Sequence, residues 1–173
     1  KLRMLAAADS HIHVGYLSGL REMAARGVFV YAANEGGPEW QYEWLIHGEY
    51  PHRLLGHRDQ FSVGYIEFVA VHTPGHTPAH LSYLVRDVGG GAKDFIALAS
   101  GDFVFVGDVG RPDLLERAAG MVGVMEPSAR AQFASIQREF RGLPEFIQVW
   151  RAHGAGSACG KSLGDVPTST VGY

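Results

Sequence analysis

Short apolar runs separated by glycine, proline and polar turns divide the chain into strands and a few helices. Helical spacing predicts helices over 18–26, 114–119 and 127–141, with one or two helical turns within 39–47. Apolar runs predict strands over 28–32, 61–63, 66–71, 81–85, 95–99, 103–106 and 146–150. Because strands lead into loops and helices lie between and after them, the pattern predicts an α/β sheet sandwich.

The two longest predicted helices each present an apolar face. Ser18 is expected to cap the first helix and Gly27 to end it. Pro127 opens the second helix, which Gly142 and Pro144 terminate. The apolar residues at core spacing are Leu17, Leu20 and Ala24 in the first helix and Phe133, Ile136 and Phe140 in the second.

Composition and charge argue against several classes of protein. The chain has 173 residues, enough for one domain with a substantial core, and we expect 1–173 to form one. A formal net charge of -3 offers no basic stripe for nucleic acid, and no apolar run approaches the roughly 20 residues of a membrane span. The one cysteine, Cys159, excludes an internal disulfide framework, so a cytoplasmic location is expected.

Histidines and a carboxylate gather at the predicted ends of strands. Three imidazoles lie within nine residues around the Pro-Gly turn of 72–80, and Asp102 follows a predicted strand. Upstream, His11 and His13 are two residues apart, so both side chains would point the same way from a strand end or loop. These residue types in loops suit a metal ion better than a protein core.

Four motifs give the chain a resemblance to a known family. They are His-Ile-His-Val-Gly-Tyr-Leu-Ser-Gly at 11–19, His-Thr-Pro-Gly-His-Thr-Pro-Ala-His at 72–80, the run from Ser-Gly-Asp to Arg-Pro-Asp-Leu-Leu at 100–115, and Gly-Ala-Gly-Ser-Ala-Cys-Gly-Lys at 154–161. With these motifs the sequence resembles the metallo-β-lactamase superfamily, and more narrowly the bacterial persulfide dioxygenases that are often fused to rhodanese domains. The resemblance implies an αββα sandwich with a metal where the loops of its two sheets meet. Compared with that family the chain lacks the first N-terminal strands, so a fragment of a longer protein is expected.

The resemblance also implies a ligand set. The two-metal hydrolases of the superfamily need an Asp and a His where this chain has Gly15 and Tyr16, so a complete second site is not expected. Persulfide dioxygenases usually carry the Asp at the position of Gly15 as well, so its absence implies weakened metal binding or activity. The remaining ligands are His11, His76 and Asp102, a two-His-one-carboxylate set for one Fe(II) per chain, with Zn(II) as the alternative.

Three functions follow as hypotheses. The first is a persulfide dioxygenase that oxidises glutathione persulfide, or a similar small persulfide, with O₂ to sulfite and glutathione. Its catalytic residues on the substrate side would be His13 and His153, although partly exposed loop histidines are an equal interpretation. The second is a zinc thioester hydrolase similar to glyoxalase II, and the third is a degenerate, non-catalytic module of a sulfur-handling protein. The family resemblance also suggests a C-terminal rhodanese domain in the full protein and assembly as a homo-oligomer.

Several other side chains have an expected structural role. His72 and His80 are expected to hydrogen-bond around the ligand loop, whereas His47, His52 and His57 are expected to be solvated. Further expectations are a charged network of Asp108, Arg111 and Asp113 that fixes the loop after Asp102, a buried or turn-lining Cys159, and a backbone cradle for glutathione carboxylates at Gly154, Gly156, Gly160 and Lys161.

Overall fold

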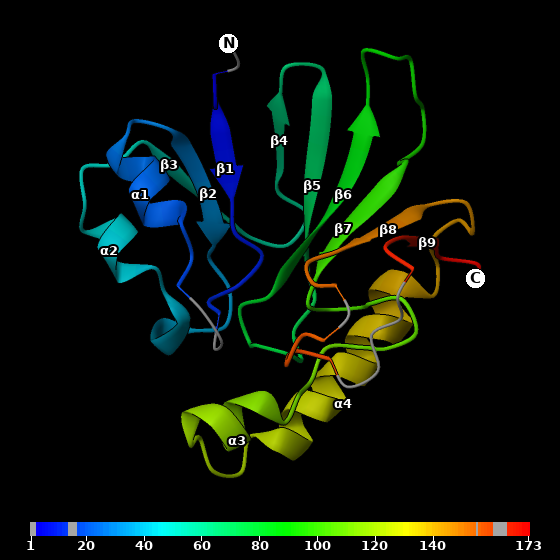
Figure 1. Ribbon diagram of the computed structural model, residues 1–173. Helices are drawn as coiled ribbons and strands as arrows, with labels where there is room; N and C mark the ends of the chain where they lie inside the picture. Colours follow the sequence, from blue (N-terminus) through cyan, green and yellow to red (C-terminus); the bar gives the residue numbers. More distant parts are fainter. Residues whose placement is uncertain (1–2, 14–16, 155, 161–165) are drawn as a thin grey trace.

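Two β-sheets form the centre of the molecule, as the computed structural model of residues 3–13, 17–154, 156–160 and 166–173 shows (Figure 1). The smaller sheet has the order β1-β2-β3, and all its pairs are parallel. The larger sheet has the order β4-β5-β6-β7-β8-β9, antiparallel except for the parallel β7-β8 pair. The strands are β1 Ala6–Ala8, β2 Phe29–Ala33, β3 His52–Leu55, β4 Gln60–Val63, β5 Ile66–His72, β6 Leu81–Asp87, β7 Ala97–Gly101, β8 Gln148–Arg151 and β9 Ser169–Thr170.

Helices cover the outer faces of the two sheets (Figure 1). The helices beside the smaller sheet are α1 Leu20–Ala25, the 3-10 turn η1 Pro38–Trp40 and α2 Glu43–Ile46. Beside the larger sheet lie α4 Met125–Ser135 and the π-helical turn η2 Ile136–Phe140, whereas α3 Leu114–Ala119 lies against α4, below the ends of the strands. The layers are therefore helix, sheet, sheet and helix, which confirms the predicted αββα sandwich.

The alternation of side chains along the strands builds two cores. On β6, Leu81 and Tyr83 face the smaller sheet and belong to the first core. Tyr31 of β2 stacks there on Phe61 of β4, with ring centroids 3.8 Å apart, and so joins the two sheets. Leu84 joins the second core, which lies between the larger sheet and the helices α4 and η2. The two cores fix both sheets, and with them the loops at their ends.

Several predicted elements were wrong or missed. The apolar segment 103–106 is a buried loop, joined to the following turn by an isolated bridge between Val104 and Val109. Its side chains are buried because Phe103 packs into the core beneath the larger sheet and Phe105 against Leu114 and Cys159. The strands β1, β3 and β9 were not predicted.

The predicted helical faces also need correction. Leu17 is 98% exposed, because α1 begins only at Leu20, whose N–H is accepted by Ser18 Oγ at 3.1 Å. Phe133 is 65% exposed, because α4 turns Gln132 and Ser135 toward the protein instead. No helix in the described parts of the chain is long and apolar enough to cross a membrane.

Candidate metal centre

The structure brings the three predicted ligands together from both sheets. His11 follows β1, His76 lies in the loop after β5, and Asp102 comes directly after β7. Asp102 Oδ2 lies 3.3 Å from His76 Nε2 and 3.6 Å from His11 Nε2. One ligand atom from each residue lies within 4.8 Å of the others, a spacing that one ion can span.

The buried polar atoms of this cluster fit a metal ion. The side chains of His11, His76 and Asp102 are at most 1% exposed. Both Nε2 atoms and both carboxylate oxygens have no hydrogen-bond partner among the described residues. Buried polar groups without partners destabilise a fold, and a cation held by nitrogen and oxygen donors would satisfy these atoms together.

The imidazole nitrogens that face away from the cluster are held in place. His76 Nδ1 donates to the carbonyl oxygen of Arg111 at 3.1 Å, and Ser10 Oγ lies 2.9 Å from His11 Nδ1. Such contacts fix the ring orientation and leave Nε2 for an ion. Burial lowers the pKa of both His11 and His76, so each ring is neutral and able to act as a ligand.

His80 connects the ligand loop to Asp102 through a buried chain of hydrogen bonds. Its Nε2 accepts the Asp102 N–H at 2.9 Å, so the ring proton is on Nδ1 and is donated to Thr73 Oγ1 at 2.8 Å. Thr73 Oγ1 lies 2.9 Å from Ser82 Oγ, which in turn donates to the Ser100 carbonyl at 3.2 Å. His80 therefore has the expected structural role and fixes the backbone of the carboxylate ligand.

The loop around Asp102 is closed so tightly that one position requires glycine. A Cβ atom on Gly110 would lie 1.7 Å from the Asp102 carbonyl oxygen and 3.2 Å from the Cβ of His76. Since no side chain fits there, Gly110 allows the 107–113 loop to pass directly over the ligand residues.

The two histidines predicted on the substrate side differ in their surroundings. His153 Nε2 lies 3.1 Å from Asp102 Oδ1, and its side chain is 17% exposed. His13 Nε2 instead lies 3.5 Å from Asp9 Oδ1, although its ring centroid is 4.1 Å from that of His11. The structure thus places His153 against the carboxylate of Asp102 and His13 beside the ring of His11.

Cys159 is buried, as expected, but its position within the centre was missed. Its Sγ lies within 4.8 Å of ligand atoms of both Asp102 and His153. Burial, followed by the negative charge of Asp102, raises the pKa of this thiol to about 11, so it stays protonated without a metal. The irregular, glycine-rich segment around Cys159 carries no periodic pattern from which this approach could have been found.

Arg111 fixes the segment that carries Cys159. Its Nη1 donates to Ala158 O at 3.1 Å, and its N–H donates to Cys159 O at 3.2 Å. A bidentate pair with Asp113 holds the guanidinium, with Nε–Oδ1 at 3.0 Å and Nη2–Oδ2 at 2.7 Å. Arg111 and Asp113 thus fix a loop, as expected, and Asp108 Oδ1 accepts the adjacent Val109 N–H at 2.8 Å.

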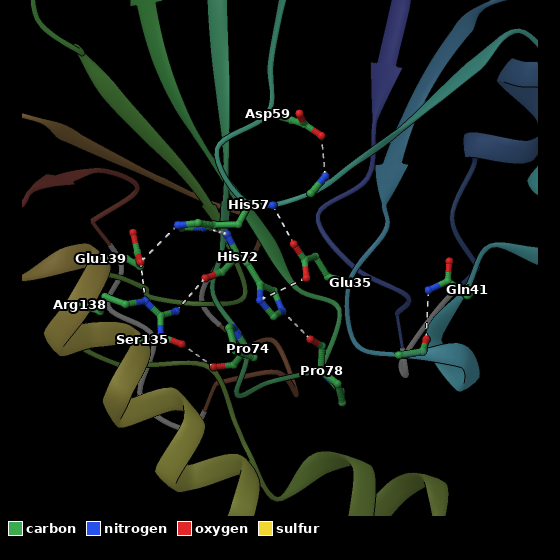
Figure 2. Close-up of polar contacts among 12 residues, drawn as sticks. Glu35, Gln41, His57, Asp59, His72, Pro74, Pro78, Ser135, Arg138 and Glu139 are labelled. Carbon is green, nitrogen blue, oxygen red and sulfur yellow. Dashed lines mark hydrogen bonds and ion pairs between the residues drawn. The ribbon is translucent and has the colours of Figure 1, made fainter.

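A polar cluster supports the outer side of the 72–80 loop (Figure 2). His72 Nε2 donates to Pro78 O at 2.7 Å, and the His72 N–H donates to His57 Nδ1 at 3.1 Å. From α4, Ser135 Oγ donates to Pro74 O at 2.8 Å. The histidine at 72 therefore has its expected structural role.

Two of the three histidines expected to be solvated have structural contacts. His57 is exposed, yet it accepts the hydrogen bond from His72. His52 is half-buried because it belongs to β3, where its Nδ1 lies 2.8 Å from Tyr50 O. His47 is exposed, as predicted.

Gly15, Tyr16 and Lys161 lie outside the described residues, so their predicted roles stay predictions.

Known proteins of the same fold identify the family. No protein-family model matches the chain. The structure of a metallo-β-lactamase from Staphylococcus aureus subsp. aureus COL is 39% identical, with a TM-score of 0.84 over 98% of this chain and 45% of that chain. The chain belongs to the metallo-β-lactamase superfamily. This confirms the broader resemblance, whereas the narrower one to persulfide dioxygenases stays a prediction.

Other superfamily members share less of the sequence. A hydroxyacylglutathione hydrolase from Actinobacillus pleuropneumoniae serotype 3 is 25% identical over 88% of this chain and 52% of its own length. TTHA1623, crystallised in a di-iron-bound form, is 25% identical with a TM-score of 0.59 over 97% of this chain and 73% of that chain. The chain spans about half the length of the hydroxyacylglutathione hydrolases from Actinobacillus that it matches.

Proposed function

We propose that this chain is an iron-dependent persulfide dioxygenase that uses glutathione persulfide as its substrate. The observation that supports it is the buried set of His11, His76 and Asp102, two imidazoles and one carboxylate with ligand atoms within 4.8 Å. This is the donor set of non-haem Fe(II) oxygenases, in which the other positions of the metal stay open. Fe(II) held by these residues would supply the Lewis acidity and redox chemistry that the oxidation of a persulfide by O₂ requires.

The reaction consumes one persulfide, one O₂ and one water, and yields glutathione, sulfite and two protons. The sulfur–sulfur bond breaks, the terminal sulfur is oxidised, and O₂ is reduced. The chain's part is to hold the ion through His11, His76 and Asp102, and to keep these ligands oriented through Arg111 and Ser10.

His153 provides a group for proton transfer at the edge of this centre. Its Nε2 lies 3.1 Å from Asp102 Oδ1, and its partial exposure connects the ring with solvent. An imidazole in this position can accept the proton that the persulfide loses on binding and pass it to water.

Oxygen uptake tests the proposal. The iron-loaded chain is mixed with glutathione persulfide, and both O₂ consumption and sulfite formation are followed. We expect equal amounts of the two, and loss of both in His76→Ala, whereas His47→Ala, which changes an exposed histidine, retains them.

A zinc thioester hydrolase is the second candidate. It is favoured by the likeness to a hydroxyacylglutathione hydrolase and by a second donor group on the other side of Asp102, formed with His153 and Cys159. If the chain hydrolyses a glutathione thioester and consumes no O₂ when mixed with glutathione persulfide, the hydrolase replaces the dioxygenase as the proposed function.

A further inference from the structure

We infer that a cavity beside the metal centre binds the amino-acid end of the substrate, the γ-glutamyl group of glutathione persulfide, by its carboxylate and its ammonium group. The cavity has a volume of about 380 Å³ and lies between the 9–13 segment, α1 and the start of α2. Its lining includes His13, whose ring centroid is 4.1 Å from that of the ligand His11. This assignment rests on the proposed function, because it takes glutathione as the carrier of the reacting sulfur.

Charged side chains of both signs line the cavity. Arg21 and Glu22 lie on α1 and are exposed, whereas Asp9, which follows β1, is buried. An α-amino acid group is a zwitterion, so its carboxylate can pair with Arg21 and its ammonium with Glu22 or Asp9. A ligand end with charge of only one sign would meet a like charge in the cavity, which selects against it.

Tyr42 contributes a buried hydroxyl to the cavity wall. This residue is 4% exposed, and its hydroxyl has no hydrogen-bond partner in the part of the chain that the structure describes. Burial, followed by the negative charge of Asp9, raises the pKa of the phenol, so it stays protonated and can donate. A buried donor without a partner is costly, and a ligand carboxylate in the cavity would accept its hydrogen bond.

Apolar side chains form the rest of the wall and suit the methylene groups of a γ-glutamyl chain. Leu20 of α1 and Trp44 of α2 line the cavity, together with Ile12. The guanidinium carbon of Arg21 lies 6.0 Å from the centroid of the Trp44 ring, a distance that allows a cation–π contact. The contact restrains the guanidinium, so less conformational freedom is lost when a carboxylate binds.

Calorimetric titration of the whole chain with S-methylglutathione tests the inference. This probe keeps the γ-glutamyl group but has no free thiol, so its binding requires neither iron nor turnover. We expect it to bind the wild-type chain, and to bind Arg21→Gln about 10-fold more weakly because a charge-assisted contact is lost. Arg26→Gln is the matched control, since Arg26 is exposed at the end of the same helix and does not line the cavity.

An analogue without the α-carboxylate separates a direct contact from a change of structure. The S-methyl derivative of 4-aminobutyryl-cysteinylglycine should bind equally well to the wild-type chain and to Arg21→Gln. If Arg21→Gln weakens this analogue as much as S-methylglutathione, the pairing of Arg21 with the carboxylate is wrong.

Tyr42→Phe distinguishes a ligand-binding hydroxyl from a structural one. Because the hydroxyl has no partner among the described residues, its removal should leave the free energy of unfolding in urea unchanged or raise it. The dissociation constant of S-methylglutathione should nevertheless rise about 3- to 10-fold. A less stable Tyr42→Phe chain that binds the probe as tightly as wild type would contradict the assigned role.

Failure of this inference and failure of the proposed function give different results. No binding of S-methylglutathione by the folded wild-type chain, or equal binding by Arg21→Gln, would overturn the inference even if glutathione persulfide drives O₂ uptake. Binding that depends on Arg21 without such uptake would support the cavity and contradict the dioxygenase.

Discussion

His80 is the residue on which the position of Asp102 depends most directly, because its ring accepts the Asp102 N–H and donates to Thr73. In His80→Ala both partners would lose a buried hydrogen bond and a cavity would form. We expect the free energy of unfolding to fall by about 2–4 kcal/mol and iron affinity by roughly 10- to 100-fold. Urea unfolding and iron titration measure both, with the exposed His47→Ala as the matched control.

At position 110 the close approach of the Asp102 carbonyl leaves room for glycine but for no side chain. In Gly110→Ala the new methyl group would meet the Asp102 carbonyl, so the loop must shift. We expect a loss of about 1–3 kcal/mol in unfolding free energy and reduced iron content. Gly142→Ala is the control, because a Cβ there has open space and the free energy should hardly change. Equal behaviour of the two variants would show that the close approach is unimportant.

Among single residues, the metal ligands were the easiest to predict from the sequence. His11, His76 and Asp102 could be selected because each stands in a long motif at a predicted strand end, and the structure brings them together. The approach of Cys159 could not be predicted, because it depends on the distant side chain and backbone of Arg111. A lone cysteine in an irregular segment gives no pattern that specifies its neighbours.

Among the elements, the 107–113 loop joins the metal centre to the segment around Cys159 through Arg111 and Asp113. The Arg111 guanidinium holds the pKa of Asp113 at about 2, below its ordinary value of 3.8. A carboxylate whose pKa is lower in the folded state stabilises the fold fully above about pH 4, and this contribution is lost as the pH falls toward 2.

Asp113→Asn should therefore remove the part of the acid-induced loss of unfolding free energy that comes from this ion pair. The difference in unfolding free energy between wild type and variant should be largest near pH 6 and shrink between about pH 4 and pH 2. Urea unfolding over this pH range measures it. A difference that stays constant through the acid range would mean that the ion pair does not contribute.

The success of the element predictions depended on hydrophobic pattern. Strands β5 and β6 were found because their apolar runs are long and bounded by turns. β1 was missed because Ala6–Ala8 has low strand propensity and is held mainly by pairing with β2. The 103–106 run was mistaken for a strand because burial in a loop and burial in a sheet give the same apolar pattern.

At the scale of the whole molecule, the metal centre connects the two sheets. His11 comes from the loop after a strand of the smaller sheet, whereas His76 and Asp102 follow strands of the larger sheet. An ion shared by these residues would therefore link both halves of the sandwich, and it would stabilise the folded chain because the unfolded chain does not present the three ligands together.

Metal removal should lower thermal stability. At a metal concentration about 100-fold above the dissociation constant, binding contributes about 2.7 kcal/mol, which chelation would remove. Thermal unfolding of the wild type should shift downward with chelator and recover with added iron. His76→Ala should respond less to either treatment, and an equal response would place the stabilising ion elsewhere.

The iron content of the purified chain, measured by elemental analysis after expression with iron supplied, tests the proposed metal centre. The ligand set of His11, His76 and Asp102 predicts about one iron per chain in the wild type and almost none in His76→Ala. A wild-type chain without iron, or a His76→Ala variant that keeps it, would contradict the proposed centre.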